Sequence, residues 1–204
     1  LIGDTGAVEG VFCAVSEETD RVISERRLES LRELASGLAA AQGRTQVVEA
    51  VQTGLAHNRS DLPFSIVYLF GEDGEPQMAA HAGIAADHPL TSAECWSLDR
   101  LTDNNAILVE DAPPGDLPTG NWDRSPSRIA IVPLGAQVGH RPRGALVVGL
   151  NPYRPASDQY LSFLDLLGGQ IASGLASADA LEARTRERDR VRDLFRQAPS
   201  FMCI

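Results

Sequence analysis

The sequence predicts one α+β domain with a mainly antiparallel sheet that carries its helices on one face. Three observations support this prediction. Of the 204 residues, 43% are hydrophobic, which is enough for a buried core. Apolar residues at helical spacing near both ends enclose a middle section of short β-branched runs. Gly71-Glu-Asp-Gly74 separates two of these runs as a hairpin turn does, so that pair of strands should be antiparallel.

Two helices are expected before the sheet. The first begins near residue 16 and ends near residue 42, and its apolar face carries Leu28, Leu31 and Leu38. The second covers about 45–58, and its valines and Leu55 form a stripe that should pack on one face of the sheet.

Five strands are expected after these helices. The strongest is apolar on nearly both faces, which favours a central place in the sheet. It is followed by the hairpin turn and a returning strand. The expected strands cover residues 64–70, 77–82, 106–110, 128–134 and 144–150.

Two irregular segments interrupt the strands. Residues 84–104 should form a loop or short helix at 87–94, an extended piece at 95–98 and a helical turn at 99–104. The second segment, 111–126, is rich in proline and long for a connection, which is typical of functional loops. Both segments should cover the sheet face opposite the helices and leave a pocket there.

The last expected element is a long helix over residues 157–198. Its apolar positions between Tyr160 and Leu181 follow helical spacing, whereas 182–196 is a run of arginines and acids spaced for helix-surface pairs. A mixed-charge helix of this kind usually reaches a partner helix. For its apolar half, packing on the sheet of the same chain and packing on a partner both remain open.

Composition excludes several classes of function. The net charge of −10 argues against nucleic-acid binding. All 18 basic residues are arginines, so no phosphate-binding or Schiff-base lysine exists in this sequence. No catalytic motif and no metal-ligand spacing is present, and no apolar run has the length of a membrane span. Three scattered cysteines favour a reducing, cytoplasmic setting, and the ends of the sequence indicate a piece of a longer protein.

Six residues are candidates for lining the pocket, and each has a structural alternative. The two tryptophans could stack on a planar ligand or fill the pocket as core. The cysteine could be a reactive thiol or a small buried hydrophobe. The histidine could point into the pocket or form a hydrogen bond at the surface, and the arginine could bind an anion or pair with an acid. The candidates are Tyr68, His81, Cys95, Trp96, Trp122 and Arg128.

The strand sequences resemble a known family. Ile129-Ala-Ile-Val-Pro-Leu134 and Arg143-Gly-Ala-Leu-Val-Val-Gly-Leu150 resemble the last two strands of a GAF domain, and residues 64–70 with their hairpin resemble the first two. Residues 10–19 are similar to the end of a PAS domain, and residues 194–202 are similar to the start of another. This arrangement resembles the sensory part of bacterial signalling proteins, most often histidine kinases.

The resemblance implies a division of the chain into five parts. They are a PAS remnant at 1–19, a connecting signalling helix at 20–43, the GAF core at 44–156, a helical or coiled-coil linker at 157–198, and the start of a second PAS domain at 199–204.

The resemblance also implies a non-catalytic sensory module that relays a signal to a kinase-type output domain, with a small-molecule ligand left open. It implies no cofactor. The Asn-Lys-Phe-Asp-Glu signature of cyclic-nucleotide-binding members is missing from this sequence. Bilin-binding members attach the bilin to a cysteine beside a histidine, whereas Cys95 lies between Glu94 and Trp96. The alternatives are a chromophore or cofactor sensor and a cysteine-dependent methionine sulfoxide reductase. A homodimer is expected, in which the end helices pack in parallel. The residues expected at that interface are Leu28, Leu31, Leu38, Leu164, Leu167 and Ile171.

Overall fold

A computed structural model describes residues 16–101, 106–135 and 141–197, with the side chains of 16–19 and 194–197 left out. The helices are α1 (Ser16–Ala40), α2 (Arg44–His57) and α3 (Asp158–Gln197), with short 3-10 helices η1 (Pro89–Thr91), η2 (Ala93–Cys95) and η3 (Leu98–Arg100). The strands are β1 (Ser65–Phe70), β2 (Pro76–Ala82), β3 (Leu108–Asp111), β4 (Arg128–Leu134) and β5 (Gly144–Gly149). The predicted α+β class is therefore confirmed.

The five strands form one antiparallel sheet in the order β2-β1-β5-β4-β3. The hairpin predicted from the glycines at 71 and 74 joins β1 to β2. β1 pairs with a strand on each side, so the prediction that residues 64–70 form an interior strand is confirmed, although the middle position of the sheet belongs to β5, all of whose residues are buried. Both strands are apolar on two faces, because both faces of the sheet are covered.

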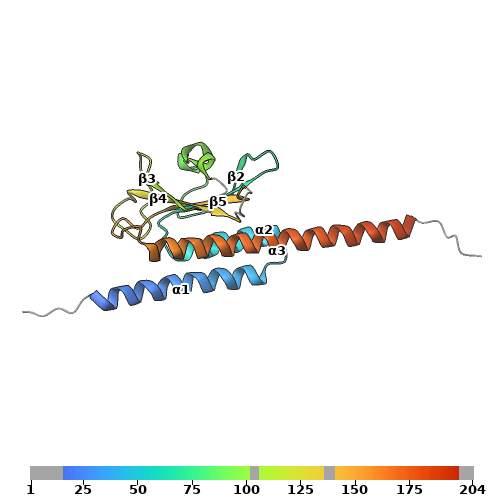
Figure 1. Cartoon of the computed structure of the whole chain (residues 1–204), viewed down its shortest axis with the longest axis horizontal. Coiled ribbons are helices and arrows are strands. Elements are labelled where there is room, and N and C mark those ends of the chain that lie inside the picture. The colour runs from blue at the N-terminus through green and yellow to red at the C-terminus, as the bar shows by residue number, and fades with distance from the viewer. Residues whose placement is uncertain (1–15, 102–105, 136–140, 198–204) are drawn as a thin grey trace, which may run out of the picture.

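The helices cover one face of the sheet and the irregular segments cover the other (Figure 1). Alternation along β1 makes this division visible. Val67 and Leu69 belong to the cluster on the helix side, whereas Ile66 and Tyr68 belong to the cluster under the loops. The layer arrangement predicted from the sequence is thus confirmed.

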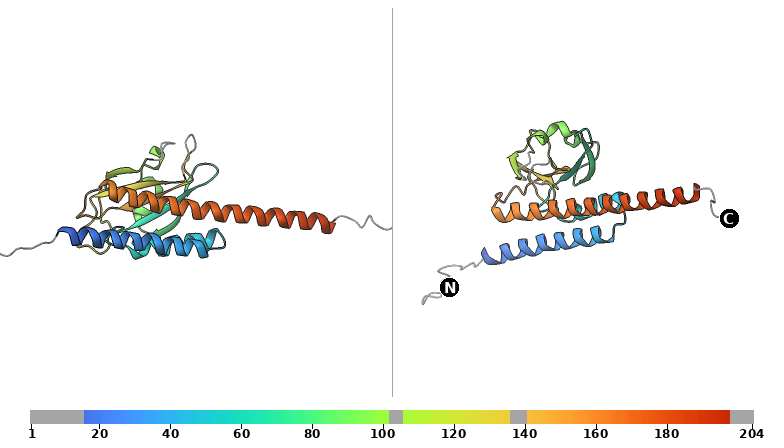
Figure 2. Two further views of the ribbon diagram at one scale, coloured as in Figure 1. Left: turned by 60° about the horizontal axis from the view of Figure 1, so that its bottom comes forward. Right: turned by 45° about the vertical axis from the view of Figure 1, so that its right-hand side comes forward.

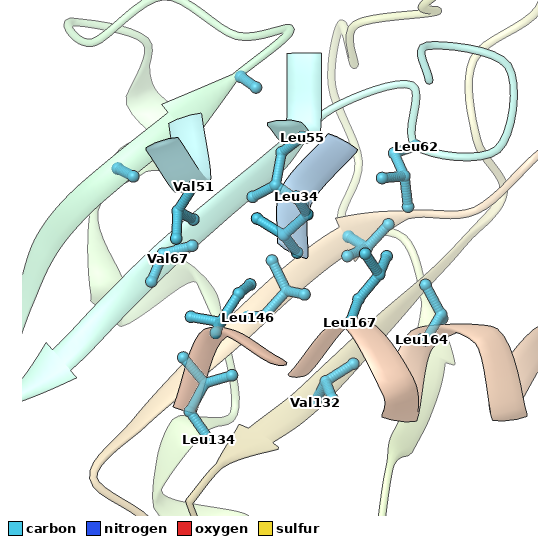
Figure 3. Packing of buried hydrophobic residues seen from close by; sticks show 14 of the residues in the cluster. Leu34, Val51, Leu55, Leu62, Val67, Val132, Leu134, Leu146, Leu164 and Leu167 are labelled. Carbon is cyan, nitrogen blue, oxygen red and sulfur yellow. The ribbon is translucent and has the colours of Figure 1, made fainter. Parts of the chain in front are cut away.

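The helix-side core joins all three helices to the sheet (Figure 3). Leu34 of α1 and Leu55 of α2 meet Leu146 of β5 and Leu167 of α3 in this cluster, and each is at most 1% exposed. Hence α1 is an integral layer of the domain as well as the segment that leads into it.

α3 is one continuous helix with two different halves. The Ser157 hydroxyl accepts a hydrogen bond of 3.4 Å from the backbone N–H of Tyr160, which confirms the expected cap. From Tyr160 to Ala178 every third or fourth residue is buried against the sheet and α1. Beyond Ala178 the described side chains are mostly exposed, and the helix extends past the body (Figures 1 and 2).

α1 and α3 lie side by side and run in the same direction (Figure 2). The start of α1 and the end of α3 therefore lie at opposite ends of the molecule (Figure 2). No helix in the described ranges is both long and apolar enough to cross a bilayer.

Some element bounds differ from the predictions. The third strand begins at Leu108 rather than residue 106, and the expected helical turn at 99–104 is η3, with residues 102–105 outside the described part. The predicted extended piece at 95–98 is broken up, since η2 ends at Cys95 and η3 begins at Leu98. Of the predicted PAS-like pieces, residues 1–15 and 198–204 lie outside the described residues, whereas 16–19 and 194–197 belong to α1 and α3.

Substitution of two neighbouring glycines of α3, Gly168 and Gly169, would show how closely this helix approaches the sheet. A Cβ atom on Gly168 would lie 2.7 Å from Cγ1 of Val132, a stiff β-branched side chain in the core, whereas a Cβ on Gly169 would meet nothing within 4 Å. We expect Gly168→Ala to lower the free energy of unfolding by about 1–3 kcal/mol. We expect Gly169→Ala to raise it by about 0.5–1 kcal/mol, through helix propensity alone. Urea unfolding of both variants measures the contrast, and a stabilised Gly168→Ala would mean that α3 does not touch β4 as described.

Candidate functional site

The face under the loops is closed by a hydrogen-bonded aromatic cluster. The Tyr68 hydroxyl donates to the carbonyl of Thr91 at 2.9 Å and accepts the indole N–H of Trp96 at 3.1 Å. The same indole N–H lies 3.0 Å from the carbonyl of Leu90, and the Trp96 ring is 6.2 Å from that of Phe64. These contacts fasten the segment of η1 and η2 onto the sheet.

Burial raises the pKa of Tyr68 to about 12, although the hydrogen bond from Trp96 opposes this shift. The phenol therefore remains protonated at neutral pH and acts as a hydrogen-bond donor to Thr91. A group held in this state serves packing and is a poor general base. Trp96 could stack on a planar ligand or fill the pocket as part of the core, and these contacts favour the second role.

A cleft of about 870 Å³ opens beside this cluster. One wall is the β1–β2 turn at residues 71–75, a second is the segment 93–101, and a third is 141–143. Trp96, Leu98 and Leu101 supply its apolar lining. At this volume the cleft falls in the size range of a small-molecule site.

The cleft is rich in acidic residues. Five carboxylates line it against two arginines. One of the arginines, Arg143, is drawn toward Asp179 of α3, with 3.4 Å between nitrogen and oxygen. A small cationic molecule with an apolar body would meet both the charge and the lining of this cleft. The acidic lining residues are Glu72, Asp73, Glu75, Glu94 and Asp99.

The six predicted pocket residues do not come together. Only Trp96 lines the cleft. Tyr68 lies beneath Trp96, His81 bonds the carbonyl of Ile84 at 2.9 Å through its Nδ1, and the exposed Cys95 donates to the carbonyl of Pro89 at 3.5 Å. Arg128 is exposed at the first residue of β4. The prediction of one pocket lined by all six is therefore corrected.

Trp122 lies in a different part of the molecule. Its indole N–H donates to the carbonyl of Ser60 at 2.8 Å, and its ring packs edge-on against Tyr153 at 5.5 Å. Leu117 of the proline-rich loop packs in the same cluster as Trp96, but around Trp122 the loop reaches the α2–β1 connection. This tryptophan lines a separate pocket next to α1.

The residues predicted to form the dimer interface also divide. Leu164, Leu167 and Ile171 are at most 1% exposed in the single chain, because they pack on their own sheet. Leu31 and Leu38 are half-buried against the same core, and only Leu28 is strongly exposed. The three α3 residues are thus corrected from interface to core positions.

A buried polar network ties both long helices to one loop. Asp61, between α2 and β1, is 1% exposed and accepts hydrogen bonds from Arg26 Nε at 2.8 Å and from Arg27 Nη2 at 3.1 Å. The Asn58 amide also donates to it at 3.0 Å. The Tyr160 hydroxyl of α3 donates to the backbone carbonyl of Asp61. α1 and α3 therefore both form hydrogen bonds to Asp61, α1 to its carboxylate and α3 to its backbone carbonyl.

Arg27 strengthens this junction by stacking. Its guanidinium carbon lies 4.3 Å from the centre of the Tyr160 ring and 5.5 Å from that of Phe163. Burial raises the pKa of Tyr160, whose hydroxyl also accepts the backbone N–H of Asn151 at 3.1 Å. This network was not predicted from the sequence. The adjacent pair Arg26-Arg27 gives no distinctive signal, because neighbouring residues on a helix are only about 100° apart and can both reach solvent.

Within residues 16–101, 106–135 and 141–197, no group of three or more His, Cys, Asp or Glu side chains is close enough to share an ion.

The sequence matches no protein-family model and no curated protein, but solved structures match the fold. The chain is similar to the GAF domain of a proposed sensor histidine kinase from Pseudomonas syringae pv. tomato, with 20% identity, a TM-score of 0.51, and coverage of 81% of this chain and 97% of that one. It is similar to the GAF domain of an Acinetobacter phosphoenolpyruvate-protein phosphotransferase, with 17% identity, a TM-score of 0.53, and coverage of 76% and 95%. A segment of a methyl-accepting chemotaxis protein matches at 14% identity, a TM-score of 0.51, and coverage of 74% and 99%.

These likenesses establish the fold alone. The chain has the α+β fold of GAF domains, as its strand sequences suggested. The adjoining PAS domains and the kinase remain predictions.

Proposed function

We propose that this chain is a non-catalytic sensory module that acts as a homodimer and relays a signal through α1 and α3 to an output domain. The observation that carries the proposal is α3 itself. α3 is one unbroken helix that is packed in the core from Tyr160 to Ala178 and is exposed and charged beyond Ala178. A displacement of the sheet would therefore move the exposed half of α3 directly.

The fold of proteins with signalling roles supports the sensory part of this proposal. Similar structures come from a proposed sensor histidine kinase and a chemotaxis protein. By this analogy the chain would be linked covalently to PAS and kinase-type domains and would work in the cytoplasm. The acidic cleft beside Trp96 is the place where a small molecule would bias the position of the helices.

Exposed apolar residues on the two long helices support dimerisation. Leu28 of α1 and Leu166 of α3 are 47% and 56% exposed. In a homodimer such residues would be buried between copies, whereas the residues of α3 that face the sheet would not take part. The interface proposed here therefore keeps Leu28 and replaces the buried α3 positions with Leu166.

Light scattering tests the dimer. The unmodified protein should have the mass of two chains at about 100 μM, a concentration at which a micromolar dimer is almost fully formed. Leu28→Arg and Leu166→Arg should shift it to one chain while the circular dichroism stays unchanged. Met78→Arg is the matched control, since Met78 is equally an exposed apolar residue but lies on β2. A monomeric unmodified protein at this concentration, or a dimer lost equally in Met78→Arg, would contradict the proposal.

A further inference from the structure

A second pocket lies between α1, the proline-rich loop at Trp122 and the segment that follows β5. It encloses about 320 Å³. Val22 and Arg26 line it from α1, Trp122 lines it from the proline-rich loop, and Tyr153 and Arg154 line it from the segment after β5. It shares no lining residue with the acidic cleft.

The walls of this pocket are held in place by hydrogen bonds. The side chains of Trp122 and Asn151 both donate to the carbonyl of Ser60, at 2.8 and 2.9 Å. Asn151 is 4% exposed and lines the pocket. Tyr153 packs edge-on against Trp122, and its hydroxyl donates to Asp123. A ligand would therefore enter a formed site rather than order a loose one.

Two guanidinium groups belong to the lining. Arg26 uses its Nε for the buried Asp61, and no described residue bonds its two terminal nitrogens. Arg154 is 3.7 Å from Asp20, an exposed carboxylate and thus a weak competitor. On a chain whose net charge is −10, this pocket is lined by two arginines, two aromatic rings and no acidic residue.

We propose that this pocket binds a small organic carboxylate with an aromatic or branched apolar body. The carboxylate accepts hydrogen bonds from Arg26 and Arg154, while the apolar body packs against Val22, Trp122 and Tyr153. The bound molecule bridges α1 to the loops. Its use as a signal rests on the relay proposed above, but the binding itself does not.

Benzoate is the probe, and the two tryptophans report on the two pockets. In 15N-labelled protein, benzoate should shift the indole N–H signal of Trp122 saturably below about 10 mM, the range expected for nine heavy atoms. The Trp96 signal, which belongs to the acidic cleft, should stay in place. Benzyl alcohol, which keeps the ring and lacks the charge, should bind roughly tenfold more weakly or worse.

Two variants test whether Arg154 binds benzoate directly or acts only through the overall charge of the protein. Arg154→Gln should weaken benzoate binding roughly tenfold, the loss expected for a charged hydrogen bond. Arg128→Gln is the control, because Arg128 is an exposed arginine that lies on β4 outside this pocket. Equal binding of benzoate and benzyl alcohol, equal losses in both variants, or no saturable shift of Trp122 would overturn the proposal. Because light scattering does not enter this test, a monomeric protein would contradict the dimer and leave the pocket standing.

Discussion

Replacement of Asp61 by alanine should lower the free energy of unfolding by about 3–5 kcal/mol, the usual result of removing one partner from a buried ion pair. The change would leave Arg27, which is 7% exposed, without its carboxylate and would free Arg26 from the loop. Asn58 would lose a hydrogen bond as well. Chemical denaturation of the variant and the unmodified protein measures the difference.

The matched control is Asp179→Ala. Asp179 also pairs with two arginines, Arg44 at 3.2 Å and Arg143 at 3.4 Å, but all three side chains reach solvent. Exposed pairs contribute little, so this variant should lose less than about 1 kcal/mol. Similar losses in the two variants would mean that the Asp61 network is not buried as described.

Hydrogen exchange should locate the effect. Because Asp61 joins α1 to the body, its loss should speed exchange along α1 more than along β5. An Asp61→Ala variant whose α1 amides exchange as slowly as before would argue against a role for Asp61 in holding the incoming helix.

The sequence predicted the elements well because local patterns decide them. The runs at 128–134 and 144–150 contain β-branched and apolar residues on both faces, which only a covered strand accommodates. The start of α3 is marked by the cap at Ser157. Strand order depends on long-range pairing, however, and the pattern of 64–70 could not show that 144–149 would take the central place.

The candidate pocket could not be predicted in the same way. Trp96 and Trp122 both occur in irregular segments, and residue type alone placed them together. Their actual positions follow from hydrogen bonds to residues distant in the sequence, Tyr68 for one and Ser60 for the other. Such partners are set by the path of each loop, which carries no periodic signal.

Helical periodicity also left one ambiguity that burial resolves. A stripe at three- and four-residue spacing marks the apolar face of a helix, but it does not say whether a sheet or a second helix covers that face. The sheet of the same chain covers Leu164 and Leu167. The exposed Leu166 between them lies off that stripe, so the pattern gave it no role.

Ile171→Asp should abolish cooperative folding. Ile171 is fully buried in the helix-side core, so the variant would lose apolar burial and place a carboxylate where no solvent reaches it. Together these costs exceed about 5 kcal/mol, which equals the whole stability of many domains. The milder Ile171→Ala should remain folded with a loss of about 2–5 kcal/mol, so its denaturation curve gives the measurable value.

Arg188→Asp is the control on the same helix. Arg188 lies on the projecting half, 75% exposed, and its only described ion pair is a contact of 3.7 Å with Asp189. Its replacement should change stability by less than about 0.5 kcal/mol, because exposed sites without packing tolerate substitution. The pair of variants also decides between core and interface. An interface residue changed to aspartate leaves a folded single chain, whereas a core residue leaves a chain without fixed tertiary structure. A folded, monomeric Ile171→Asp protein would therefore return Ile171 to the dimer interface and detach that half of α3 from the sheet.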